Sequence, residues 1–162
     1  MCGILGIASR NHQVFAELYD GLLMLQHRGQ DASGIVTYGD GFFRERKANG
    51  LVKDVFGAKD ADPLQGGIGM GHVRYPPAGS LSAAEAQPFF VNAPYGIYLV
   101  HNGNITNTEE QRAKVTGKYS RHLRTTSDSE IMLNVLADKV ADAIKVNGNA
   151  DPIRNIFAGV KM

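Results

Sequence analysis

Cysteine, net charge and long apolar runs are all scarce in this 162-residue sequence. Its single cysteine cannot form an internal disulfide, which favours a reducing compartment such as the cytoplasm. A net charge of +1 gives no electrostatic reason to expect nucleic acid or an anionic membrane as a partner. No apolar run approaches the roughly 20 residues that a membrane-spanning helix needs. We therefore expect a cytoplasmic protein that binds neither nucleic acid nor membrane.

The first residues also lack the features of a secretory signal. The segment from Cys2 to Ala8 has neither a basic flank nor a long apolar core. A cleaved signal would also remove the only cysteine. The remaining composition, 43% hydrophobic and 20% charged, is ordinary for a soluble protein, and the length suits one domain.

The apolar pattern predicts an α+β fold with helices packed on sheets. Strands are expected at residues 2–7, 34–38, 42–47, 68–73 and 95–101, the first and last of them buried. Helices are expected at residues 15–26, 51–56, 108–116, 127–146 and from 152 onward. This order differs from the regular strand–helix alternation of a doubly wound parallel fold.

Local signals set the expected ends and faces of the helices. Gly29 should end the first helix, and Pro152 should open the last. Ser127, followed three residues later by Glu130, predicts a capping box. Four apolar residues after that cap recur at helical spacing and should face a sheet: Leu133, Leu136, Val140 and Ile144.

The only cysteine is residue 2, directly after the start methionine. If Met1 is removed, Cys2 carries both a thiol and a free α-amine. An unperturbed α-amine has a pKa of roughly 7.7–8.0. The amine can therefore take the thiol proton without a histidine partner. A lone cysteine is more often a small buried residue, so position alone leaves both interpretations open.

Four other residues suit a cysteine that attacks the amide of an amino acid. The Asn102 side chain and the Gly103 N–H form a compact pair of donors for an oxyanion. Arg74 can hold a carboxylate, and Asp128 can hold an ammonium group. Plainer alternatives are an Asn-Gly turn, a surface ion pair for Arg74, and helix-dipole complementarity for Asp128.

Taken together and in this order, the motifs resemble the class II glutamine amidotransferases, which are N-terminal nucleophile hydrolases. The resemblance is strongest in residues 25–34, 47–51, 71–75, 85–89, 101–104 and 125–130. Within the family, the motifs are most similar to the glutaminase domains of amidophosphoribosyltransferases. His27, Gln30 and Tyr75 stand where glucosamine-6-phosphate synthases or asparagine synthetases usually have other residues.

The resemblance implies a reaction and a division of roles. L-Glutamine would be hydrolysed to glutamate and ammonia through a γ-glutamyl thioester on Cys2, with the α-amine as base. Asn102 and Gly103 would form the oxyanion hole, and Arg28 and Gly29 would support the loop around the thiol.

The substrate would be held by three further residues. Arg74 would bind the glutamine α-carboxylate, Asp128 would bind its α-ammonium, and Tyr75 would also contact the substrate. No metal or cofactor is expected in this segment. Pro77 stands where the family usually has a threonine. In the family that threonine helps to bind the substrate carboxylate, and proline lacks both its hydroxyl and its backbone N–H.

The resemblance also implies an αββα sandwich, of which residues 1–162 would be the N-terminal part of a type 2 glutamine amidotransferase domain. The final strands and a C-terminal phosphoribosyltransferase domain, which would use Mg, would be absent. That domain would use the ammonia to make 5-phosphoribosylamine in the first step of de novo purine biosynthesis, in a homo-oligomer. The alternatives are the glutaminase domain of another class II enzyme, such as glucosamine-6-phosphate synthase, or an inactive fragment.

A sheet that ends at Val100 would leave an exposed edge and a partly covered helix stripe. The isolated chain is therefore expected to be poorly stable or to aggregate, with little activity until the downstream strands are restored.

Overall fold

The computed structural model describes residues 1–75 and 83–161, so the loop expected around Pro77 lies outside the described residues. The chain divides into two units. The first comprises Met1–Pro88 and Val100–Asn102, and the second comprises Phe89–Leu99 and Gly103–Met162. Helices and antiparallel sheets occur together, which confirms the α+β expectation. None of the helices in the described part of the chain is long and apolar enough to span a membrane.

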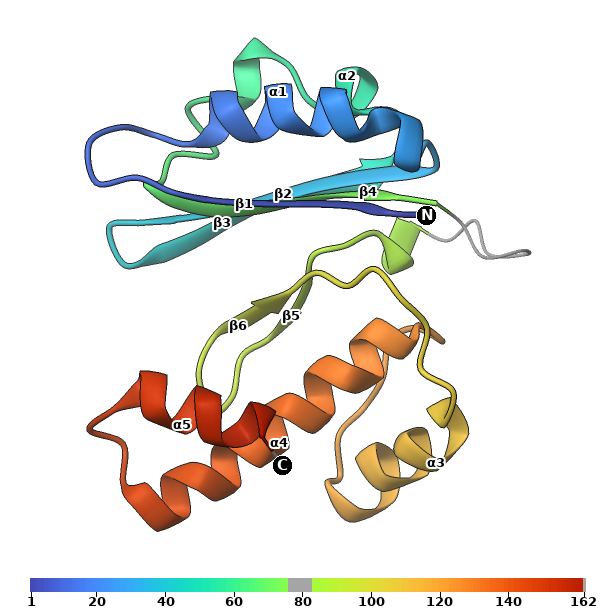
Figure 1. Cartoon of the computed structure of the whole chain (residues 1–162), viewed down its shortest axis with the longest axis vertical. Helices are drawn as coiled ribbons and strands as arrows, with labels where there is room; N and C mark the ends of the chain where they lie inside the picture. Colours follow the sequence, from blue (N-terminus) through green and yellow to red (C-terminus); the bar gives the residue numbers. More distant parts are fainter. Residues whose placement is uncertain (76–82, 162) are drawn as a thin grey trace. The chain divides into compact units, whose positions relative to one another are not determined.

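The first unit contains a four-stranded antiparallel sheet (Figure 1). Its strand order is β1-β4-β2-β3. Its strands are β1 (Gly3–Ala8), β2 (Ala32–Gly39), β3 (Phe42–Asn49) and β4 (Ile68–Arg74). Gly3 of β1 is opposite Val73 of β4, and Ala32 of β2 is opposite Arg74. In this register the start of β1, the start of β2 and the end of β4 lie at the same end of the sheet.

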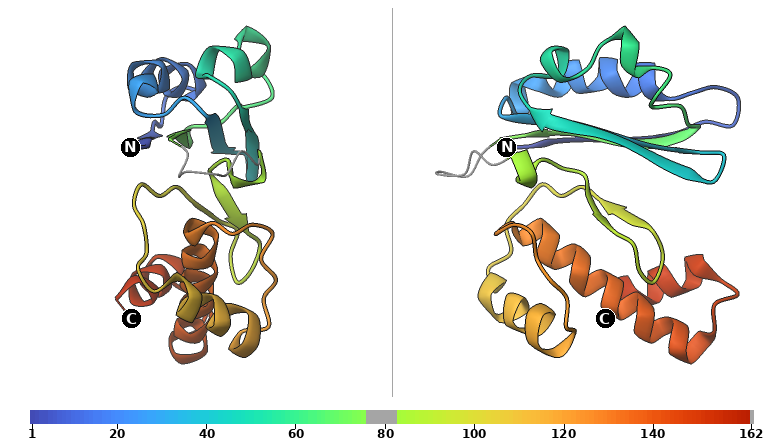
Figure 2. Two further views of the ribbon diagram at one scale, coloured as in Figure 1. Left: turned by 90° about the vertical axis from the view of Figure 1, so that its right-hand side faces the viewer. Right: turned by 180° about the vertical axis from the view of Figure 1, so that it is seen from behind.

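Helix α1 (Phe15–Leu25) lies along one face of this sheet, with the short helix α2 (Val52–Val55) beside it (Figures 1 and 2). Leu18 and Leu22 of α1 are fully buried. A Cβ at Gly69 would lie 2.7 Å from Leu18 Cδ1, and one at Gly71 would lie 2.7 Å from Leu22 Cδ1. The glycines of β4 therefore allow the helix to pack closely against the sheet.

The expectation that the first strand is buried is wrong, because β1 is at the edge of the sheet. Successive side chains of a strand point to opposite faces. Leu5 packs against the core beneath α1, whereas Ile4 is 41% exposed.

The second unit contains a two-stranded antiparallel sheet and three helices. The strands are β5 (Phe89–Val91) and β6 (Ile97–Leu99), and the helices are α3 (Thr108–Ala113), α4 (Asp128–Asn147) and α5 (Pro152–Val160). A π-helical turn, Lys114–Lys118, continues α3. The sequence did not predict β5. Strand β6 is only half-buried and is shorter than expected, because residues 100–102 belong to the first unit.

The start of α4 differs from the expected capping box. Ser127 is the N-cap, and its Oγ accepts a hydrogen bond from the Ser129 N–H at 3.3 Å. The Glu130 carboxylate accepts from the backbone N–H groups of Arg124 (2.9 Å) and Thr125 (2.8 Å). The Ser127 N–H donates instead to Thr125 Oγ1. Glu130 therefore fixes the preceding loop rather than completing a reciprocal cap.

Other expectations for the helices are confirmed in whole or in part. Leu133 and Val140 of α4 are fully buried, whereas Leu136 and Ile144 are half-buried. Helix α4 contacts both strands of the small sheet and also α5. Helix α5 begins at Pro152 as expected, and the Asp151 side chain caps it by accepting from the Arg154 N–H at 2.9 Å.

Candidate active site

The Cys2 thiol lies next to the residue that follows β4. Cys2 is half-buried, immediately before β1. The backbone N–H of Tyr75 donates to Cys2 Sγ across 3.4 Å, and Sγ lies 3.9 Å from the Tyr75 carbonyl oxygen. The pairing of β1 with β4 explains this arrangement, because Gly3 and Val73 are partners and the next residues continue the register.

Two side chains from distant parts of the sequence bind the Cys2 carbonyl oxygen. Arg28 Nε donates to it at 3.0 Å, and Asn102 Nδ2 donates to it at 3.1 Å. Arg28 is in the 3-10 turn Gln26–Arg28 that follows α1. The backbone of the expected nucleophile is thus held by two of the residues that the sequence motifs singled out.

Gly29 follows this turn and does not end α1, which corrects the expectation. Helix α1 stops at Leu25, and Gly29 has an extended backbone, with φ at −161°. A Cβ at Gly29 would lie 2.5 Å from the carbonyl carbon of Arg74. Glycine is needed here because the turn passes directly against the end of β4. Gln26 supports the turn by donating to the Gly29 carbonyl oxygen at 2.5 Å.

Arg74 is buried, which rules out the surface ion pair considered from the sequence. It is 5% exposed at the end of β4. Its Nη1 lies 3.0 Å from Asp31 Oδ2, and its Nη2 donates to Glu85 Oε2. Both carboxylates are also largely buried. Sequence reasoning missed these two acidic partners, although both are in the motif segments 25–34 and 85–89.

Tyr75 is 61% exposed and lines a pocket of about 410 Å³ in the first unit. The pocket is also lined by His27, Gly29, Gln30 and Asp31. Two residues that line this pocket contact the predicted site: Tyr75 donates its N–H to the Cys2 sulfur, and Asp31 forms an ion pair with the buried Arg74.

Gly103 and Asp128 belong to the second unit. Asp128 is the first residue of α4, and its Oδ2 accepts from the Ile105 N–H at 2.9 Å. Its Oδ1 accepts from Ser129 Oγ at 3.2 Å. Asp128 therefore fixes the segment just after Gly103 to the start of α4, a role beyond simple complementarity to the helix dipole.

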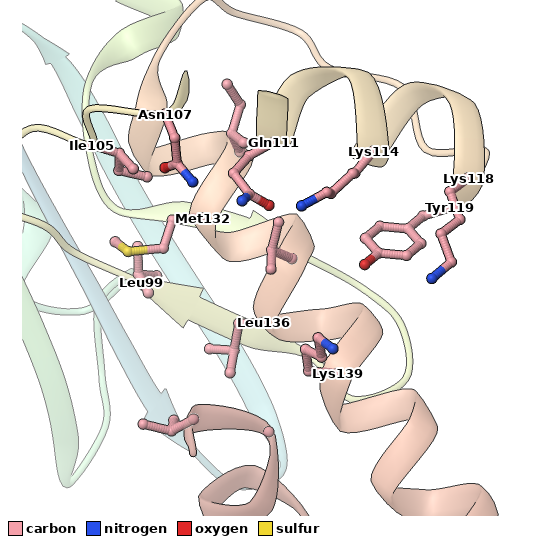
Figure 3. A pocket seen from close by; sticks show the side chains of 14 residues that line it. Leu99, Ile105, Asn107, Gln111, Lys114, Lys118, Tyr119, Met132, Leu136 and Lys139 are labelled. Atoms are coloured by element: carbon pink, nitrogen blue, oxygen red, sulfur yellow. The ribbon is translucent and has the colours of Figure 1, made fainter. Parts of the chain in front are cut away.

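The larger pocket, of about 740 Å³, lies in the second unit and contains none of the predicted site residues (Figure 3). Leu99, Met132 and Leu136 line it together with the lysines Lys114 and Lys139. In residues 1–75 and 83–161, no group of three His, Cys, Asp or Glu side chains could hold a metal ion.

Comparison with known proteins agrees with the motif order. Residues 72–150 match the family described as "Glutamine amidotransferase domain". The chain is 55% identical over 161 residues to the amidophosphoribosyltransferase of Escherichia coli strain K12, covering 99% of this chain and 31% of that protein. It is 45% identical over 163 residues to the Saccharomyces cerevisiae protein of the same name, covering 99% and 32%.

The comparisons confirm the glutamine amidotransferase resemblance. The chain spans about a third of the length of these relatives. It also resembles the solved structure of glutamine phosphoribosylpyrophosphate amidotransferase from B. subtilis complexed with ADP and GMP, with a TM-score of 0.75 and 26% identity over 100% of this chain and 33% of that one. A second structure, titled "structure of the allosteric regulatory enzyme of purine biosynthesis", matches with a TM-score of 0.76 and 28% identity, covering 100% and 33%. These matches confirm the expected N-terminal nucleophile hydrolase fold of the glutamine amidotransferases.

Proposed function

We propose that this chain hydrolyses L-glutamine to glutamate and ammonia with Cys2 as the nucleophile. The observation that carries the proposal is the set of contacts around Cys2: a backbone N–H on its sulfur and two side chains on its carbonyl. A cysteine that only fills space in a core needs none of these polar contacts. Here they come from three separate motifs and hold a residue at the end of the chain.

The chemistry follows from groups on this chain. After removal of Met1, the α-amine of Cys2 takes the thiol proton, and the sulfur attacks the carboxamide carbon of glutamine. Asn102 Nδ2 and the Gly103 N–H then donate to the oxyanion. An amide nitrogen carries two N–H donors, so the bond from Asn102 to the Cys2 carbonyl leaves a second donor for this purpose. The proton held by the amine passes to the departing ammonia, and water hydrolyses the thioester to glutamate.

Arg74 is proposed to hold the α-carboxylate of glutamine. A guanidinium has five N–H donors, and the two ion pairs to Asp31 and Glu85 fix its plane. With two carboxylates beside it, Arg74 would recognise the substrate through directed hydrogen bonds rather than through excess positive charge. Asp128 is proposed to hold the α-ammonium, and Tyr75 to form part of the pocket wall.

The acceptor of the ammonia follows from the relatives. We propose that this chain is the N-terminal part of a longer amidophosphoribosyltransferase, because the named relatives are about three times its length. In that setting the ammonia would pass to a phosphoribosyltransferase domain that uses Mg, yielding 5-phosphoribosylamine for purine biosynthesis in a homo-oligomer. The second candidate considered from the sequence, glucosamine-6-phosphate synthase, gains no support from the relatives reported above.

Glutamate release from L-glutamine tests the proposal. It is measured on the chain alone and on a chimera in which residues 1–161 replace the matching part of the Escherichia coli relative. Intact mass shows whether Met1 has been removed. Processed protein should release glutamate, whereas protein that retains Met1 should be inactive, because the Cys2 nitrogen is then an amide and cannot act as a base. Full activity with Met1 in place contradicts the proposal. So does the absence of turnover in processed protein, both as the chain alone and as the chimera.

A glutamine analogue carrying a diazo-ketone in place of the carboxamide provides a second test. It should alkylate Cys2 alone, and excess glutamine should slow the labelling. Peptide mapping identifies the modified residue. Modification of any other side chain argues against Cys2 as the nucleophile.

A further inference from the structure

The backbone of His101, one residue before Asn102, is held by the side chain of Gln87. The His101 N–H donates to Gln87 Oε1 at 2.6 Å, and Gln87 Nε2 donates to the His101 carbonyl oxygen at 3.2 Å. A side-chain amide thus pairs with both backbone polar groups of one residue, as a neighbouring strand would. Gln87 is 7% exposed, so these bonds are shielded from water.

His72 binds the same carbonyl oxygen from strand β4. It is fully buried in β4, and its Nε2 lies 3.3 Å from the His101 carbonyl oxygen. Burial is the main reason why the pKa of His72 falls to about 4, and the nearby charges of Arg74 and His101 also lower it. The ring is therefore neutral at pH 7, and its Nε2 carries the proton because the partner is a carbonyl. Nδ1 is buried without a hydrogen-bond partner among the described residues.

A glycine on β2 makes room for the Gln87 backbone. Gly34 is opposite His72 in the β2–β4 register. A Cβ at Gly34 would lie 1.9 Å from the Gln87 carbonyl oxygen, so the Gln87 backbone rests directly on β2. Lys47, which is opposite Gly34 on β3, donates to the Pro88 carbonyl oxygen at 2.5 Å. The sheet therefore holds the Gln87 backbone in place, and the Gln87 side chain in turn holds His101.

We propose that Gln87 and His72, here called the His101 clamp, are positioning residues for the oxyanion hole. They hold the backbone of His101 so that the next residue, Asn102, presents its amide to the reacting carbonyl. This inference rests on the proposed glutaminase function. A misplacement of about 1 Å in a catalytic group can cost roughly 10²-fold in rate. Both side chains contact the His101 carbonyl oxygen, so they reach the oxyanion hole through the backbone next to Asn102.

The prediction separates the catalytic rate from substrate binding. Gln87→Glu keeps the size of the side chain but replaces the donor to the His101 carbonyl with an oxygen, and His72→Phe keeps a ring without a donor. Each should lower kcat for glutamine hydrolysis by about tenfold or more while KM changes less than about twofold. Gly34→Ala should produce the same pattern, because its new methyl group displaces Gln87.

Thr37→Val is the matched control for a merely structural effect. Thr37 is buried on β2, the same strand as Gly34, and its Oγ1 donates to the Gln65 carbonyl oxygen at 3.2 Å. The variant therefore also loses one buried bond from a side chain to the backbone, but away from His101. Its kcat should stay within about twofold of wild type even if its melting temperature falls as much as that of the clamp variants.

The γ-aldehyde analogue of glutamine gives a readout that a structural role would not change. Its carbonyl adds the Cys2 sulfur to form a hemithioacetal, whose oxygen occupies the position of the oxyanion. Clamp variants should bind this aldehyde more weakly by about the factor lost in kcat, while their affinity for the product glutamate stays unchanged. Clamp variants that keep wild-type kcat and aldehyde affinity overturn the inference. A wild-type chimera with the Escherichia coli relative that releases no glutamate overturns the function on which it rests.

Discussion

The two units differ in the size of the sheet against which their helices pack. In the first unit, α1 and α2 enclose a core against four strands, including the fully buried Leu18, Ile35 and Val73. The second unit has only the β5–β6 pair, and two strands alone are marginally stable in water. Its helix α5 leaves Ile153, Phe157 and Val160 more than 60% exposed. The nucleophile thus belongs to the unit with the four-stranded sheet, and the proposed ammonium ligand belongs to the unit with the two-stranded one.

Replacement of the nucleophile should have the largest effect and should be confined to chemistry. Cys2→Ser should lower glutamine hydrolysis by roughly 10⁴-fold or more, since a serine hydroxyl is a much weaker nucleophile at neutral pH. The melting temperature should change little, because the two side chains are similar in size. Glutamate release and thermal melting measure the two effects. Retained turnover in the serine variant would show that Cys2 is not the nucleophile.

The next contrast compares one residue from each unit. Asn102→Ala should lower kcat by roughly 10²- to 10³-fold, because its donor acts on charge that develops only in the transition state. Asp128→Asn should instead raise KM, because its contact with the ammonium persists from ground state to transition state. Steady-state kinetics on both variants separate these outcomes. Equal effects of the two on KM would mean that the roles are wrongly assigned.

Arg74 provides a check on the same division within the first unit. Arg74→Lys keeps the charge but loses the planar fork that pairs with Asp31 and Glu85. We expect KM for glutamine to rise more than kcat falls. Because a buried partner is disturbed, unfolding must be measured in parallel. An unchanged KM with a lower kcat would show that Arg74 acts in the chemical step rather than in substrate binding.

The first unit, which has the larger sheet, should be more stable than the second. Amide hydrogens of β5 and β6 should exchange at least about tenfold faster than those of β2 and β4, a difference of about 1.4 kcal/mol. Extension through the downstream region of the Escherichia coli relative should protect β5 and β6, raise the melting temperature and reduce aggregation. Equal protection of both sheets in the chain alone would end the distinction between the units.

A dependence of stability on pH should also arise in the first unit. The folded pKa of His72 is about 4, below the unfolded value of 6.5, so the unfolded chain binds more protons between these values. The contribution is fully present above about pH 6.5 and is lost as pH falls towards 4, amounting to about 3 kcal/mol. Denaturant titrations give the free energy of unfolding at each pH. Between pH 4 and 6.5 this free energy should rise with pH more steeply in the wild type than in His72→Phe. The same pH dependence in both proteins would show that folding does not lower the pKa of His72.

Periodicity in the sequence was sufficient to predict most of the elements. A helix was predicted at residues 15–26 and two strands at 34–38 and 42–47, and these correspond to α1, β2 and β3. Strand β5 was missed because three residues between prolines carry no measurable alternation. The capping box failed because Glu130 had better partners in the preceding loop, which a pattern along one helix does not reveal.

For the candidate site, the sequence predicted individual residues better than their partners. Cys2, Arg28 and Asn102 were singled out from motifs and do converge on one carbonyl group. The burial of Arg74 between two acids depends on the pairing of β2 with β4 and on a short 3-10 turn at residues 83–85. The contacts of Gln87 with His101 likewise require knowledge of which residues meet across the sheet. Such long-range contacts leave no local periodicity.

Residue 2 takes its three contacts from residues 26, 73 and 100 positions further along the chain. During synthesis, the thiol cannot reach this geometry until Asn102 has also left the ribosome. The nucleophile therefore stays unassembled until the 100 positions that separate it from Asn102 have been made. Its reactivity towards a thiol reagent, followed on stalled chains of increasing length, would report the moment at which the first unit closes.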